Sequence, residues 1–133
     1  MGCLCGGVIS DVVCPCPTEG WILRDEDQDD FYSVTARDIA SFLAAVQGGT
    51  RSAWIATFFS PQFPTDISDE SIVYDILAFQ KRRVVLSIAE CSQCGRLWVQ
   101  RGPRINAYLS YVPDEPGYAA VLRSHPVEGT IGE

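Results

Sequence analysis

Apolar residues recur every three to four positions through the middle of the chain, and this spacing predicts an amphipathic helix. The helix begins near Asp27, within an acidic run that suits a helix N-terminus, or at Thr35, with Asp38 as capping-box partner. The glycine pair Gly48-Gly49 ends it in either case. Its apolar positions are Phe31, Val34, Ile39, Phe42, Leu43 and Val46.

Two further helices are predicted after this one. Residues 51–60 are apolar and aromatic, and Ser60-Pro61 stops that segment. Ser68 is a favourable N-cap for a second main helix, because it precedes the acidic residues of a first turn. The buried face of this helix consists of Ile72, Val73, Ile76 and Leu77.

From Lys81 the helical period gives way to alternation, which predicts strands. The first of these strands, around Val84 to Ala89, runs into a turn at residues 91–94. Returning strands are expected at residues 96–100, 105–111 and 118–122. Near the N-terminus, Trp21-Ile22-Leu23 predicts one more short strand.

Charge narrows the classes of function. The chain has 133 residues, a formal net charge of −7 and a pI of about 4.6. This balance disfavours nucleic acid as a partner and permits a basic protein. No apolar run is long enough to span a membrane and no export signal is visible, so we expect a cytoplasmic protein.

Two cysteine pairs, each followed by glycine, carry the most specific chemistry. They are Cys3-Leu4-Cys5-Gly6 and Cys91-Ser92-Gln93-Cys94-Gly95. Each pair can hold half of a tetrahedral Zn²⁺ site, and two halves make a closed four-cysteine site of the structural kind. We therefore predict one structural zinc, bound by Cys3, Cys5, Cys91 and Cys94.

Two other cysteines leave alternatives open. Cys14 and Cys16 could replace Cys3 and Cys5 as ligands, form a redox pair or be inert. Each is followed by proline, which has no N–H to donate to sulfur, so the first pair is preferred. The pair Cys91 and Cys94 could also be a redox CxxC pair. A low-pKa redox cysteine commonly stands at a helix N-terminus, but a strand rather than a helix is expected after this pair.

The zinc prediction completes the fold prediction. We expect an α+β domain in which a helical segment is inserted between two zinc-knuckle β elements and is followed by a C-terminal antiparallel meander. It is one zinc-ribbon-like domain over residues 1–133, with a loosely ordered tail from about residue 123.

The sequence offers few residues or motifs that could support catalysis. His125 is the single histidine, and no nucleophile, phosphate-loop or metalloprotease motif is present. We expect a protein that is not an enzyme.

The acidic run has two possible interpretations. It consists of Asp25, Glu26, Asp27, Asp29 and Asp30. It is either a solvated helix start or a docking face for a basic protein, whose approach dense carboxylates would steer. Trp98, after the second knuckle, is a further candidate for partner binding. The basic residues Lys81-Arg82-Arg83 could contact phosphates, so a nucleic-acid-binding zinc ribbon is the alternative function.

The motifs resemble those of small uncharacterised bacterial proteins with a CxCG…CxxCGRLW pattern. The matching segments are residues 3–11, the acidic segment at residues 23–27, and residues 91–98. The Cys14-Pro15-Cys16 insert departs from the pattern. In size and charge the chain is similar to immunity proteins of bacterial toxin systems. This resemblance favours a non-catalytic acidic protein-binding module, of the immunity or adaptor type.

Overall fold

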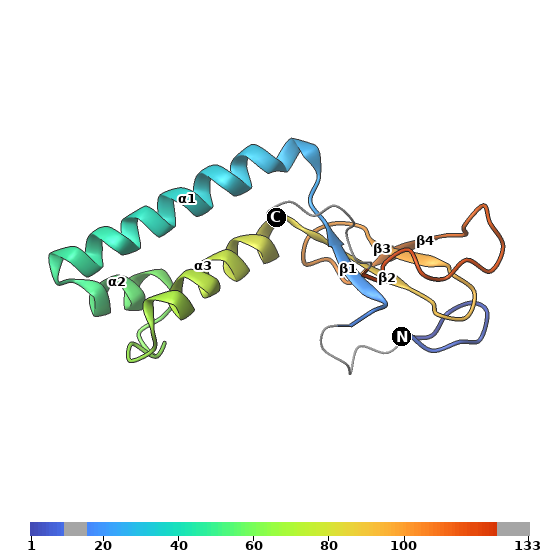
Figure 1. Cartoon of the computed structure of the whole chain (residues 1–133), viewed down its shortest axis with the longest axis horizontal. Helices are drawn as coiled ribbons and strands as arrows, with labels where there is room; N and C mark the ends of the chain where they lie inside the picture. The colour runs from blue at the N-terminus through green and yellow to red at the C-terminus, as the bar shows by residue number, and fades with distance from the viewer. Residues whose placement is uncertain (10–15, 125–133) are drawn as a thin grey trace, which may run out of the picture. The chain divides into compact units, whose positions relative to one another are not determined.

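A computed structural model describes residues 1–9 and 16–124 of the chain (Figure 1). It has the predicted α+β architecture. In the sequence, three helices come between the first and second of four strands. Cys14 and His125 lie outside the described residues, as does most of the tail predicted from residue 123. The elements are β1 (Glu19–Ile22), α1 (Asp25–Gly48), α2 (Arg51–Phe58), α3 (Asp69–Val84), β2 (Leu86–Glu90), β3 (Leu97–Gln100) and β4 (Tyr108–Tyr111).

The chain forms two compact units. The helical unit is Leu23–Val84, and the β unit consists of Met1–Ile22 together with the chain from Val85 onward. In the helical unit, α1 and α3 lie side by side with α2 between them in sequence (Figure 1). Their buried faces share one apolar core of Phe42, Ile55, Ile72 and Ile76.

The long helix α1 starts at Asp25, slightly before the earlier of the two predicted starts. Its first turn is acidic, which favours the helix dipole, and Arg24 pairs with Asp27 at 2.7 Å. The alternative start at Thr35 is wrong, because Thr35 is buried in the middle of the helix. Gly49 ends the helix in the left-handed conformation, as the glycine pair predicted.

Helix α3 runs further than the sequence pattern indicated. Ser68 caps its start as predicted, accepting a hydrogen bond from the Ser71 amide at 3.1 Å. The helix continues through Lys81, where the sequence indicated a change of period, to Val84, and the strand predicted from about Val84 begins at Leu86. Contacts with α1 account for the extension, since Gln80 donates to Asp38 at 2.7 Å and Arg83 pairs with Asp30 at 2.6 Å.

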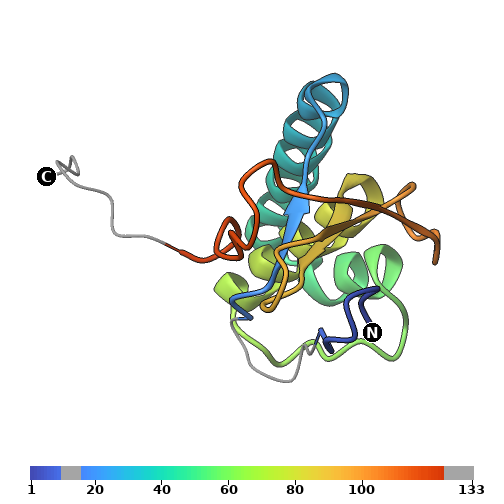
Figure 2. The same cartoon turned by 90° about the vertical axis from the view of Figure 1, so that its right-hand side faces the viewer.

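The four strands form one antiparallel sheet in the order β1-β2-β3-β4, seen from two sides in Figures 1 and 2. Strands β2 to β4 are the predicted meander, and β1 adds to its edge beside β2. Glu19 is paired with Ala89, and Ala89 in turn with Trp98. Directly paired residues share a face of the sheet, so these three side chains lie on one face.

The strand predicted at residues 118–122 does not form. The amides of Val121 and Leu122 instead donate to the two carboxylate oxygens of Glu90, at 3.0 and 3.2 Å. Glu90 is 1% exposed at the end of β2. A buried carboxylate needs hydrogen-bond donors, and these amides supply them in place of a strand ladder.

Membrane-spanning helices were also sought among the described residues. None of the helices there has both the length and the apolar character needed to cross a bilayer.

Candidate metal centre

The first knuckle is a closed loop at the start of the chain. Met1 and Ile9 exchange two backbone hydrogen bonds across its base, at 3.1 and 2.8 Å, and Cys3 donates to the Gly7 carbonyl at 2.9 Å. Gly6 turns the chain with φ of 93°, a conformation that side chains disfavour. The Gly7 amide then donates to the Cys5 sulfur at 3.4 Å, as zinc-knuckle amides do for a thiolate.

The second knuckle is the turn between β2 and β3. Cys91 donates to the Arg96 carbonyl at 3.0 Å and accepts at its own carbonyl from Gly95 at 2.8 Å. Gly95 has φ of 77°, and a Cβ there would overlap the carbonyl oxygen of Tyr118. Only glycine fits this position, because both the backbone conformation and the close approach of the C-terminal segment exclude a side chain.

The two knuckles bring the four predicted sulfurs together. The Sγ atoms of Cys3, Cys5, Cys91 and Cys94 all lie within 4.8 Å of one another. The closest pairs cross between the knuckles, Cys3 with Cys94 and Cys5 with Cys91, each at 3.6 Å. A zinc ion bound at about 2.3 Å to each sulfur of a regular tetrahedron requires sulfur separations of about 3.8 Å. The donor set and its spacing therefore fit one tetrahedral metal ion.

The thiols differ strongly in acidity. Hydrogen bonding from the Cys5 backbone lowers the pKa of Cys3 to about 6, with a smaller contribution from Cys94, against the opposing effect of burial. The backbone of Arg96 also favours the Cys94 thiolate, but burial and the three surrounding thiols prevail and raise the pKa of Cys94 to about 12. One thiolate thus forms readily and opposes further ionisation, until a divalent cation supplies the compensating charge.

Trp98 lies against this cluster. The side chain packs on the small core formed by Cys3, Ile9, Ala89 and Cys91. Its indole Nε1 is buried and makes no hydrogen bond among the described residues, although its proximity helps to lower the pKa of Cys3. A buried N–H needs an acceptor, and the Cys3 sulfur is a group whose pKa this indole lowers. Its predicted role in partner binding stays a prediction.

The other predicted residues lie apart from the cysteine cluster. Cys16 is outside the four-sulfur group, and its Sγ is 3.3 Å from the Thr18 hydroxyl. The acidic run forms the first two turns of α1 in the helical unit. Asp25, Glu26, Asp29 and Asp30 are exposed there, and Asp27 is half-buried.

Glu90 is the residue that sequence reasoning missed. It precedes the first ligand of the second knuckle and holds the segment that packs on Gly95. Its sequence signal is a charged residue in the apolar alternation that leads into the knuckle, which indicates a buried and partnered carboxylate.

Comparison with known proteins gives one match. The family model described as "Domain of unknown function (DUF8617)" matches residues 1–115, a span that includes both knuckles and the whole helical unit. No curated protein and no solved structure shows significant similarity to the chain.

Proposed function

The chain belongs to the DUF8617 family, a domain of unknown function, and we propose that it is a non-catalytic protein-binding module whose β unit is held by one structural zinc ion. The observation that carries this proposal is the closed set of four cysteine sulfurs. With four thiolates on a tetrahedral ion, no coordination position remains for water or substrate. Such a centre stabilises a fold and does not activate a reactant.

Tetrahedral sulfur coordination suits zinc in particular. Four thiolates select zinc or iron among the common metals, and zinc undergoes no redox change at such a site. The ion would join the N-terminal knuckle to the β2–β3 turn across 85 intervening residues, counted between Cys5 and Cys91. It would therefore fix the N-terminal loop to the sheet.

A thiol–disulfide redox role has less support. Low-pKa redox cysteines of CxxC pairs commonly stand at a helix N-terminus, where the dipole stabilises the thiolate. Here strand β2 leads into the Cys91 turn and strand β3 leads out of it. The four sulfurs also group across the two knuckles rather than as one isolated dithiol.

The proposed partner is a basic protein that docks on the start of α1. Asp25, Glu26 and Asp29 are exposed there with no ion pair among the described residues, whereas Asp27 and Asp30 are neutralised by arginines. Unpaired exposed carboxylates in a chain of net charge −7 attract a basic surface and raise its association rate. These exposed carboxylates fit an adaptor or an immunity-type protein that captures a basic partner. We place this protein in the cytoplasm.

The test uses a partner captured from the native cells and then purified. The variant Asp25→Asn, Glu26→Gln, Asp29→Asn removes the three unpaired charges, and Asp66→Asn, Glu70→Gln, Asp114→Asn removes three exposed acids elsewhere. We expect the first variant to slow association roughly tenfold at low salt, and the control to slow it much less. The difference should shrink as salt rises, because exposed charges are screened. Equal association rates for the two variants would refute the docking face.

A further inference from the structure

The sheet of the β unit has two edge strands, β1 and β4, which differ in composition. Strand β1 begins with the carboxylate of Glu19 and follows Pro17, and charge and proline are two features that keep natural edge strands from pairing with other chains. Strand β4 has neither feature, because residues 105–112 include no charged residue and no proline. The β4 edge is therefore open to pairing with another strand.

The pairing of β4 with β3 determines which of its backbone groups face outward. The Arg101 amide donates to the Ala107 carbonyl at 2.8 Å, which makes these two a hydrogen-bonded pair in the register of the β3–β4 ladder. Bonded and non-bonded pairs alternate, so Leu109 also bonds to β3, whereas Tyr108 and Ser110 turn their N–H and C=O groups away from it. Among the described residues, these outward groups have no backbone partner.

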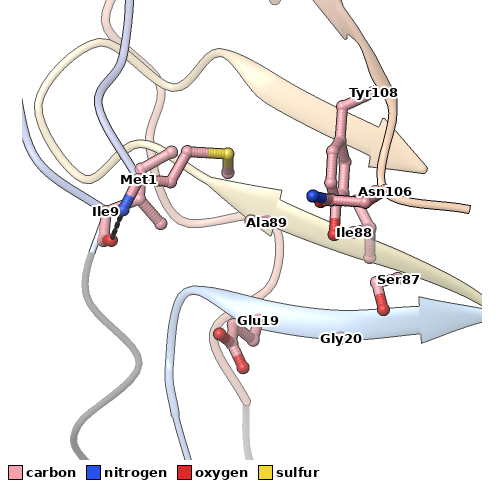
Figure 3. A pocket seen from close by; sticks show the side chains of 9 residues that line it. All are labelled: Met1, Ile9, Glu19, Gly20, Ser87, Ile88, Ala89, Asn106 and Tyr108. Atoms are coloured by element: carbon pink, nitrogen blue, oxygen red, sulfur yellow. Dashed lines mark hydrogen bonds between the residues drawn. The ribbon is translucent and has the colours of Figure 1, made fainter.

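The side chains of β4 alternate between the two faces of the sheet. Tyr108 lines a pocket of about 460 Å³ on one face (Figure 3). This pocket lies beside the metal centre, because its walls Ile9 and Ala89 also belong to the small core around the cysteines. On the other face, Leu109 and Tyr111 are 44% and 55% exposed. A strand added at this edge would cover part of both side chains, so it would gain apolar burial as well as hydrogen bonds.

We infer that β4 pairs with β4 of a second copy of this chain, antiparallel and centred on Leu109. In this register, Tyr108 of each copy lies opposite Ser110 of the other, and the outward N–H and C=O groups of both residues are satisfied. The two Leu109 side chains meet in the central non-hydrogen-bonded pair, where side chains approach most closely. The two four-stranded sheets then form one continuous sheet with two-fold symmetry.

Charge complementarity points to a second copy and to this register. The nearest charged residues on either side of β4 are Arg104 and Asp114, five positions before and five after Leu109. Both are exposed, and neither forms an ion pair within the part of the chain that the structure describes. Antiparallel pairing brings Arg104 of each copy to the end where Asp114 of the other stands, which gives two ion pairs per dimer. A register shifted by two residues in either direction places each charge opposite an uncharged residue.

The experiment measures self-association of the metal-loaded full chain by analytical ultracentrifugation over a series of concentrations. Arg104→Asp and Asp114→Arg each bring like charges together twice per dimer, so each should weaken the dimer roughly tenfold. An equimolar mixture of these two variants should associate again, as heterodimers, because one variant then has acids at both ends of β4 and the other has arginines at both ends. Arg82→Asp and Asp66→Arg, at exposed positions of the helical unit, change the net charge by the same amounts and should have much smaller effects.

A second pair of variants tests the outward amide of Ser110. Ser110→Pro removes an N–H that points away from β3, whereas Ser110→Ala keeps this N–H and removes only the hydroxyl that accepts from Arg96 at 2.9 Å. We expect Ser110→Pro to be monomeric at concentrations where Ser110→Ala and the unchanged chain are dimers. Metal content and NMR spectra check that each variant is folded, and the charge variants decide the question if Ser110→Pro does not fold.

Several results would overturn the inference. They are a chain that stays monomeric at every concentration, equal effects of the β4 charge variants and their controls, and a mixture of the two charge variants that forms no heterodimer. A monomeric chain whose β4 edge captures an extended segment of another protein would overturn it as well. The inference does not rest on the proposed function. The variant Asp25→Asn, Glu26→Gln, Asp29→Asn should still dimerise while it binds the basic partner more slowly, so the two proposals can fail separately.

Discussion

The two units of this protein fill their interiors with different kinds of side chain. In the helical unit the fully buried side chains are Phe42, Ile55, Ile72 and Ile76, and eight half-buried apolar residues pack around them. In the described part of the β unit, the largest fully buried side chains are a carboxylate, Glu90, and a cysteine, Cys91. The described part of the β unit therefore has fewer large buried apolar side chains than the helical unit.

This contrast is the reason why we propose a stabilising role for the four cysteines. A small sheet with little apolar core needs another source of stability, which in small domains is commonly a disulfide or a metal. The aromatic side chains are distributed accordingly: Trp54 stacks on Phe58 at 4.8 Å in the helical unit, whereas Trp98 packs on cysteines. The following predictions separate a metal-dependent unit from a unit that is independent of the metal.

The largest effect is expected from Cys91→Ser. It removes a predicted ligand that is 0% exposed, and metal binding to small structural sites contributes on the order of 10 kcal/mol to folding. We expect loss of metal and of native structure in the β unit, with the helical unit retained. The indole N–H signals in NMR spectra report this difference, because Trp98 belongs to the β unit and Trp54 to the helical unit.

Cys16→Ser is the matched control for that change, and the Cys14, Cys16 double serine variant extends it. Both should keep the metal, since Cys16 lies outside the sulfur cluster and Cys14, like Cys16, is followed by a proline that cannot donate to sulfur. If the double variant loses its metal while a Cys3, Cys5 double variant keeps it, the ligand assignment is wrong. If Cys91→Ser also erases the native Trp54 signal, the two units are not energetically separate.

The converse change is Ile76→Ala in the helical unit. Ile76 is 0% exposed, and truncating a buried isoleucine costs about 2–5 kcal/mol, including the cavity left behind. Unfolding of the helical unit in denaturant should shift by that amount, whereas the metal content should stay unchanged. Leu77→Ala, at a neighbouring position that is 41% exposed, is the control and should cost much less. Loss of metal in Ile76→Ala would show that the β unit depends on this core.

A smaller effect is expected from Trp98→Phe. Phenylalanine keeps an aromatic ring on the small core but removes the buried N–H beside the Cys3 sulfur. Outer-shell partners of metal ligands typically change metal affinity by about 10–100-fold, so we expect a loss near the lower end of that range. Competition with a chelator measures it. Trp21→Phe, at a tryptophan that is 50% exposed, should leave the affinity unchanged, and an equal loss in both variants would rule out a specific role for Trp98.

The mildest perturbation is a change of pH. The pKa of Cys94 near 12 means that this thiol is protonated across the neutral range, so metal binding must displace its proton. Apparent metal affinity should therefore rise at least about tenfold per pH unit from pH 6 to pH 9. The pKa of Cys3 near 6 adds a second proton below that value, so the dependence should steepen on acidification. An affinity that does not change between pH 7 and pH 8 would contradict thiolate coordination.

Much of the fold could be predicted because local patterns agree with the tertiary structure. The apolar period, the Ser68 cap and the glycine pair placed the helices, and alternation placed the meander. The grouping of the four sulfurs was predicted from knuckle spacing and the glycines that follow, which is local chemistry repeated at two places.

The errors arose where distant residues decide the local structure. The last turn of α3 is helical because Gln80 and Arg83 meet partners on α1, which no local window reveals. The segment at residues 118–122 is not a strand because Glu90, some 30 positions earlier, takes its amide donors. The pocket beside the centre was also invisible to sequence reasoning, since its walls come from the N-terminal loop and three strands.

The zinc content of the native protein tests the metal centre most directly. The chain should be purified without chelator or added metal, and its metal-to-chain ratio and metal identity determined by elemental analysis. We predict one zinc per chain, retained through dialysis, because four thiolates from two knuckles close the coordination sphere. Protein that is natively folded and free of metal, or that holds a metal in far less than one-to-one ratio, would contradict the zinc-stabilised β unit.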